Sequence, residues 1–88
     1  MNPFPQNSSV LVTGAAGGIG KSIAFLFAVH YKKLYLLDLD ATKLTELESE
    51  LLSRFPEISI TLFAGSVCDN EFIDHCFSMI EADPYEFS

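Results

Sequence analysis

The sequence predicts an α/β fold in which parallel strands alternate with helices. Three observations support it. Short apolar segments alternate with segments of helical periodicity. A glycine-rich turn joins the apolar segment 10–13 to the apolar segment 23–29. An acid, Asp38, ends the apolar segment that follows. Alternation at this spacing is typical of parallel strands joined by right-handed crossovers. We therefore expect the element order β-α-β-α-β-α.

Three short segments are the predicted strands, at residues 10–13, 34–38 and 58–64. The first is too short for a test of periodicity, but its β-branched residues and the glycines that follow it favour a strand. The second ends in Asp38, and the third is followed by Gly65 and Ser66.

Three helices are predicted between and after these strands. The first follows Gly18 and runs to about Tyr31, which places Lys32 and Lys33 where cations offset the helix dipole. Asp40 is a suitable N-cap for the second helix, which Pro56 ends. Its apolar face is spaced at i, i+3, i+7 and i+11: Leu44, Leu47, Leu51 and Phe55. The third helix is capped by Asp69 or Asn70, and its apolar face consists of Phe72, Ile73, Cys76, Phe77 and Ile80.

Composition limits the possible partners and compartment. The chain has 88 residues, twelve acids against five bases and a net charge of −7. Because no run of Lys or Arg occurs, we expect neither nucleic acid nor an anionic membrane as a partner. The longest apolar run, 23–29, is too short to cross a bilayer. Cys68 and Cys76 fit no CxxC or zinc pattern, so we expect reduced thiols in a cytoplasmic protein.

The glycine-rich stretch from Thr13 to Gly20 carries the main functional signal. Gly14 would allow a tight turn out of the strand, Gly18 would let the backbone approach a pyrophosphate, and Gly20 would let the helix pack closely on the strand. Asp38 follows 18 residues after Gly20, at the end of the next predicted strand. A tight strand–helix turn with no ligand is the alternative interpretation.

These residues resemble a known family. Thr13 to Gly20 matches the TGxxxGIG loop of the short-chain dehydrogenase/reductase family, and 36–39 looks like its second strand with the acid that selects the cofactor. The resemblance runs from about residue 9 to 80 and covers the first third of a family member. It implies a truncated Rossmann-type half with three parallel strands in the order 3-2-1. The expected cofactor-binding residues are Gly14, Ala16, Gly17, Gly18, Ile19, Gly20, Asp38, Leu39, Ser66 and Val67.

The resemblance divides the chain into three parts and names a cofactor. We expect a flexible lead-in over 1–8, a dinucleotide-binding half-domain over 9–82 and a tail over 83–88. NAD is preferred over NADP, because the Asp38 carboxylate would accept the ribose hydroxyls and repel a 2′-phosphate. No Lys or Arg lies within the loop or directly after Asp38. Asp40 would act in the same way if the strand continued, or cap the next helix.

One departure from the family affects the adenine site. Family members usually have an Asp-Val pair after the third strand, and this chain has Ser66-Val67. A neutral serine hydrogen bond is worth about half of a charge-assisted one. Asp69 would either substitute for the missing carboxylate or cap the last helix.

No catalytic residue is assigned. The resemblance implies catalysis by a serine and a YxxxK pair, but none of Tyr31, Tyr35 and Tyr85 has a lysine four residues later. His30 and His75 form no metal-ligand set. We therefore expect a nicotinamide dinucleotide-binding part of an oxidoreductase that is not catalytic on its own. A second chain that carries the tyrosine and lysine is a further alternative.

A non-enzymatic role is the main alternative function. With no fourth strand beside residues 10–13, the sheet would have an open edge and one poorly covered face. Phe25 and Phe27 add apolar surface. This interpretation predicts a homo-oligomer, self-associating through the first-strand edge and the exposed sheet face, or a module that binds another partner.

Overall fold

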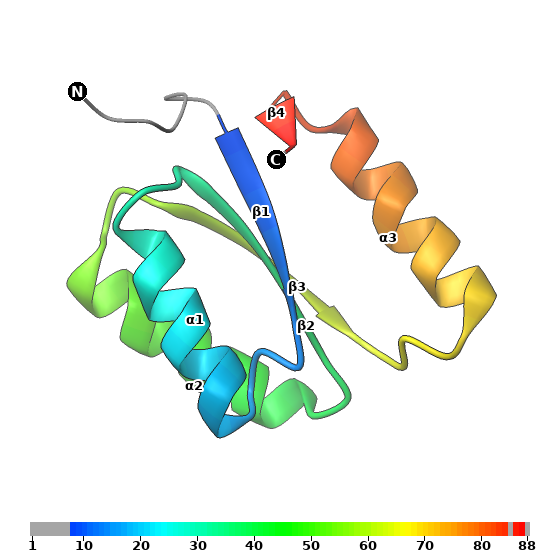
Figure 1. Ribbon diagram of the computed structural model, residues 1–88, viewed down its shortest axis with the longest axis horizontal. Helices are drawn as coiled ribbons and strands as arrows, with labels where there is room; N and C mark the ends of the chain where they lie inside the picture. Colours follow the sequence, from blue (N-terminus) through cyan, green and yellow to red (C-terminus); the bar gives the residue numbers. More distant parts are fainter. Residues whose placement is uncertain (1–7, 85, 88) are drawn as a thin grey trace.

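The computed structural model describes residues 8–84 and 86–87, and it has the predicted α/β architecture (Figure 1). A four-stranded parallel sheet has the strand order β3-β2-β1-β4. The elements in chain order are β1 (Ser8–Thr13), α1 (Gly18–Ala28), β2 (Lys33–Asp38), α2 (Ala41–Arg54), β3 (Ser59–Ala64), α3 (Asn70–Ala82) and β4 (Glu86–Phe87). The predicted order of the first three strands is therefore confirmed.

The helices form a layer on each face of the sheet. Helices α1 and α2 cover one face and α3 covers the other (Figure 1). The larger core lies under α1 and α2 and contains Leu34, Leu36 and the buried leucines of α2. The smaller core joins Tyr35 and Phe63 of the sheet to α3. Residues of β2 alternate between the two cores, as a strand buried on both faces requires.

Capping and apolar spacing explain α2 and α3. The Asp40 carboxylate accepts the Lys43 N–H at 3.0 Å, and the predicted face of α2 is buried at Leu44, Leu47 and Leu51. The Asp69 carboxylate accepts the Phe72 N–H at 3.2 Å. On α3 the buried positions are Cys76 and Ile80, while Phe77 is 41% exposed.

The end of α1 differs from the prediction. The helix ends at Ala28, and the chain turns where the N–H groups of His30 and Tyr31 both donate to the carbonyl of Phe27. Lys33 therefore lies in β2 and not at the end of a helix. Its ammonium group is buried and donates to Ser59 Oγ at 3.1 Å and Thr61 Oγ1 at 2.6 Å.

A fourth strand is present, contrary to the expectation of a free edge on β1. Glu86 and Phe87 pair in parallel with Ser8 and Ser9. The other face of the sheet is covered as well, because Cys76 and Ile80 of α3 pack on Tyr35, Leu37 and Phe63: these five residues form the smaller core. Strand β4 extends only along the start of β1. Residues 1–7 of the lead-in expected at 1–8 lie outside the described residues, whereas Ser8 is a buried residue of β1.

Candidate functional site

The candidate site lies at the carboxyl edge of the sheet, where three strand–helix connections meet. The strands are in register, with Thr13 opposite Leu37 and Leu37 opposite Phe63, so their carboxyl ends share one edge. In open parallel sheets ligands bind at this edge. A pocket of about 280 Å³ opens here. Its lining comes from all three connections: Gly14, Leu37, Asp38, Leu39, Gly65, Ser66, Val67 and Cys68.

The glycines of the first connection have different structural roles. Gly14 has a φ of +64°, which L side chains rarely adopt. A Cβ at Gly20 would lie 2.0 Å from the carbonyl oxygen of Gly14, so helix and loop approach too closely for any side chain. A Cβ at Gly18 would meet nothing within 4 Å. Space is therefore left open at the first residue of α1, where a ligand would approach the backbone.

The amino terminus of α1 has the electrostatics of an anion site. Its N-cap, Gly17, has extended backbone geometry and provides no side-chain cap, and the first turn contains no acid. The first N–H groups of a helix have no partner within it, and they lie at the positive end of the helix dipole. The N–H groups of Gly18, Ile19 and Gly20 can therefore bind a diphosphate.

Asp38 lies directly beside the glycine-rich loop. Its Oδ2 accepts the Ala16 N–H at 3.0 Å, and its Oδ1 accepts the Asp40 N–H at 3.0 Å. The loop is also fixed to β2 by a bond of 3.1 Å from the Ala15 N–H to the Leu37 carbonyl. Each Asp38 oxygen keeps acceptor capacity for a further hydrogen bond. Asp40 caps α2, as the capping alternative predicts.

Three exposed apolar side chains lie at the three strand–helix junctions: Ile19 in the first turn of α1, Leu39 after β2 and Val67 after β3. Ile19 is 80% exposed, Leu39 is 76% exposed and Val67 is 55% exposed. Apolar side chains left in water at a shared edge are suited to covering planar rings of a ligand.

The third connection places a neutral hydroxyl in the pocket wall. Ser66 is half-buried, and its Oγ accepts the Cys68 N–H at 3.1 Å. Asp69 serves as the N-cap of α3, so its carboxylate is bonded to that helix and is absent from the pocket lining.

Comparisons with known proteins identify one matching family and several similar proteins. A family model described as a polysaccharide biosynthesis protein matches residues 10–84. An uncharacterized oxidoreductase of Mycobacterium tuberculosis is 36% identical over 69 residues, which are 78% of this chain and 27% of that protein. The structure of YwfH, described as an NADPH-dependent reductase involved in bacilysin biosynthesis, has a TM-score of 0.81 at 28% identity and covers 88% of this chain and 32% of that one.

A second solved structure contains the other nicotinamide cofactor. It is a 3-oxoacyl-[acyl-carrier protein] reductase with bound NAD from Brucella melitensis, with a TM-score of 0.74 at 25% identity over 91% of this chain and 30% of that one. The chain belongs to the family of the matching model, and the curated relatives and solved structures that it resembles are short-chain dehydrogenase/reductase oxidoreductases. It spans 27% of the first curated relative and about a third of these structures, matching their N-terminal part.

Two residues that line pockets near this edge are absent from the residues predicted from the sequence. Cys68 lines the 280 Å³ pocket and is exposed. Lys43 lines a neighbouring pocket of about 220 Å³ that also includes Ala16 and Lys21. Lys21 is paired with Glu50 at 3.0 Å. Their positions in the sequence could have indicated them. Cys68 follows β3 and Lys43 follows β2 within a few residues, and residues so close to the carboxyl end of a strand line this edge.

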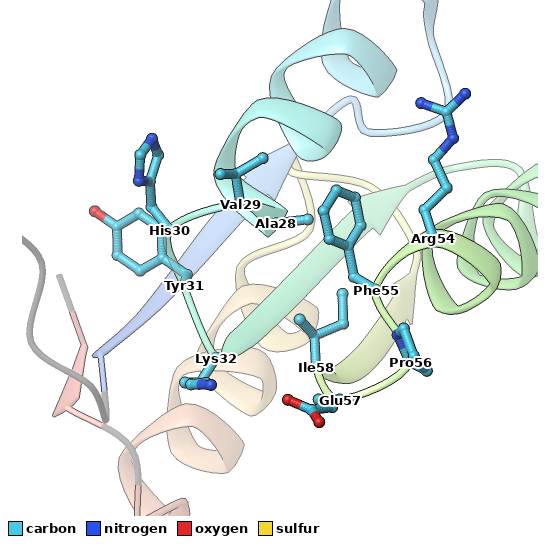
Figure 2. Close-up of a pocket in the computed structure, with 10 residues that line it drawn as sticks. All are labelled: Ala28, Val29, His30, Tyr31, Lys32, Arg54, Phe55, Pro56, Glu57 and Ile58. Carbon is cyan, nitrogen blue, oxygen red and sulfur yellow. The ribbon is translucent and has the colours of Figure 1, made fainter. Parts of the chain in front are cut away.

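A larger cavity lies at the opposite edge of the sheet. Figure 2 shows this cavity of about 490 Å³, lined by residues 28–32 and 54–58. Helices α1 and α2 end here, so their last carbonyl groups give the region a negative potential that disfavours a diphosphate. Lys32 and Arg54 also line the cavity, but its lining contains no helix amino terminus that could donate N–H groups to a diphosphate. The cavity is therefore a poor candidate for the dinucleotide site.

Among the described residues, no helix combines the length and the apolar character needed to span a membrane.

Proposed function

We propose that this chain is the NAD-binding Rossmann portion of a short-chain dehydrogenase/reductase and that it prefers NAD over NADP. The observation that carries the proposal is the Asp38 carboxylate, held by the Ala16 N–H beside the open amino terminus of α1. A carboxylate in this position can accept both ribose hydroxyl groups and repels a 2′-phosphate. Lys43, near Ala16, is the cation that would oppose this preference.

The proposed binding residues follow the three connections. Gly14, Ala16, Gly17, Gly18, Ile19 and Gly20 hold the diphosphate, Asp38 the ribose, and Leu39, Ser66 and Val67 the adenine. The open space at Gly18 and the exposure of Ile19, Leu39 and Val67 support this assignment.

The dinucleotide, when bound, would supply or accept a hydride, as in the complete relatives. The described residues orient it but offer no acid or base of the expected type. Tyr35 is buried and its hydroxyl donates to Asp83. Tyr31 is also buried, and its ring packs edge-on against Phe27. Neither phenol is free to protonate a substrate, which supports a binding role without catalysis by this chain alone. The free thiols of Cys68 and Cys76 are compatible with a cytoplasmic location.

The two cysteines allow a direct test of dinucleotide binding. Cys68 is exposed in the pocket wall, whereas Cys76 is fully buried and burial raises the pKa of its thiol. A thiol reagent should therefore label Cys68 first. Saturating NAD should slow the labelling of Cys68 in the folded chain. The labelling rate of Cys76, measured in fully denaturing urea, is the control and should not change with NAD. Equal Cys68 labelling rates with and without millimolar NAD, together with no heat in a calorimetric titration, would overturn the proposal.

Self-association is a second candidate function, favoured by exposed apolar side chains on the helices. Ile23 and Leu26 are 38% and 59% exposed on α1, and Phe77 and Met79 are 41% and 45% exposed on α3. The edge of β1 beyond Ser9 lies outside the register of β4. A second copy covering the α1 residues or this edge would remove apolar surface and unpaired backbone from water. Sedimentation analysis tests this candidate.

A further inference from the structure

Ser66 is the polar side chain that the third connection contributes to the pocket, and its hydrogen bonding is specific. Its Oγ accepts the Cys68 N–H, and among the described residues no acceptor takes the hydroxyl proton. A hydroxyl keeps both one donor and one further acceptor position. Ser66 can therefore donate to a carbonyl oxygen or ring nitrogen, or accept from an amino group.

The carboxylates near this wall are engaged elsewhere. Asp38 bonds the Ala16 and Asp40 N–H groups on the side of the glycine-rich loop. Asp69 bonds the Phe72 N–H at the start of α3. The base would lie near Leu39 and Val67, whose apolar side chains cannot form hydrogen bonds with the functional groups of the ring. Ser66 is then the side chain that contacts the polar edge of the base.

From this wall we infer that the site accepts dinucleotides whose purine carries either a 6-amino or a 6-oxo group, and that Ser66 sets this relaxed base specificity. The inference rests on the proposed dinucleotide-binding function and adds the base class to it. A carboxylate at residue 66 would only accept hydrogen bonds, so it would favour the amino group and repel the carbonyl oxygen. A hydroxyl makes one neutral bond to either edge.

The test is a calorimetric titration of the 88-residue chain with NAD and with nicotinamide hypoxanthine dinucleotide. We expect dissociation constants within about threefold of each other, because each ligand makes one neutral hydrogen bond with Ser66. Ser66→Asp should shift the ratio by about tenfold or more toward NAD. Ser66→Ala should weaken both ligands about equally and keep their ratio near that of the unmodified chain. Ser78→Asp, an exposed position on α3, is the control for added negative charge and should leave the ratio unchanged.

The outcomes separate this inference from the proposed function. If neither dinucleotide binds, the proposed function fails and the inference fails with it. If NAD binds at least about tenfold more tightly than the hypoxanthine analogue, the base specificity is strict, and the inference alone is overturned. A ratio that does not respond to Ser66→Asp, in a variant with an unchanged melting transition, also overturns it. If the aspartate variant does not fold, the affinities of Ser66→Ala for the two dinucleotides test the inference instead. Affinities equal to those of the unmodified chain would then overturn it.

Discussion

At the residue scale, two glycines of one loop have opposite tolerance for a side chain. Gly20 faces the carbonyl oxygen of Gly14 so closely that a Cβ would lie 2.0 Å away, whereas a Cβ at Gly18 meets open space. Gly20 is thus required by packing within the chain. Among the residues that the structure describes, no neighbour requires Gly18 to be a glycine, as expected of a position that a ligand approaches.

Gly18→Asp should separate binding from stability. An acid at the first residue of α1 interacts favourably with the helix dipole, so the free energy of unfolding should be unchanged or rise by about 0.3–1 kcal/mol. The same charge repels a diphosphate, and NAD affinity should fall by at least about tenfold. Calorimetric titration and urea unfolding measure the two effects. Ser78→Asp is the matched charge control, with wild-type NAD affinity.

A Gly18→Asp variant that binds NAD normally would contradict the assignment of the diphosphate to this helix. Gly20→Ala should instead lower the stability of the fold. Its free energy of unfolding should fall by about 1–3 kcal/mol or more, because the Gly14 carbonyl cannot easily move away from the added Cβ.

Asp38→Ser should change the choice of cofactor. Removing the carboxylate removes the repulsion of a 2′-phosphate, while the Lys43 ammonium group remains close to the glycine-rich loop. The ratio of NADPH to NADH affinity should rise by about tenfold or more. Fluorescence titrations with both reduced cofactors measure the ratio. Asp74→Asn, at an exposed position on α3, should not alter it. An unaltered ratio in Asp38→Ser would show that another group selects the cofactor.

At the element scale, a polar cluster joins β2 and β3 to the end of α3. Lys33 donates to Ser59 and Thr61, lies 5.1 Å from the centre of the Tyr35 ring and is 3.9 Å from the Asp83 carboxylate. Tyr35 donates to the same carboxylate. The cluster fixes the carboxyl end of α3 against the sheet just before the chain reaches β4.

Lys33 should make stability depend on pH in the alkaline range. Burial lowers the pKa of Lys33 from 10.5, and Asp83 opposes this shift only in part. Between the folded pKa and 10.5 the unfolded state binds more protons than the folded state, so the free energy of unfolding rises with pH. Lys33→Met should lose this rise. Urea unfolding at several pH values up to 10.5 measures it for both chains.

Lys32→Met is the control for this pH prediction, because the neighbouring Lys32 is exposed. Its unfolding free energy should follow the unmodified chain. If the free energy of unfolding rises with alkaline pH as steeply in Lys33→Met as in Lys32→Met, the burial of Lys33 has no effect on its titration in solution.

At the scale of the whole molecule, the sequence predicted most of the architecture because local signals agreed with the tertiary structure. Asp40 and Asp69 cap helices whose apolar spacing matches the buried faces, and the glycine-rich loop and Asp38 meet at one edge. The two-residue β4 could not be predicted, because its pairing with Ser8 and Ser9 depends on a long-range approach of the chain. The burial of Lys33 was missed because hydroxyl groups of another strand satisfy its ammonium group.

The exposed apolar residues of α1 give a prediction for the intact chain. Ile19, Ile23 and Leu26 are spaced at i, i+4 and i+7, so they lie along one face of the helix. If the chain self-associates through this face, Leu26→Glu should shift the sedimentation distribution to the monomer. Glu46→Gln on α2 should leave the distribution unchanged. A monomer for the unmodified chain at the highest soluble concentration would exclude self-association as its function.

Dinucleotide binding at the carboxyl edge of the sheet is measured most directly by the change in backbone amide chemical shifts when NAD is added to the 88-residue chain. We expect saturable shifts in three segments that are distant in sequence: residues 14–20, 38–40 and 65–68. Residues 28–32 and 54–58, which line the larger cavity, should not respond. Unchanged shifts at millimolar NAD, or shifts confined to that cavity, would show that NAD does not bind at the carboxyl edge of the sheet.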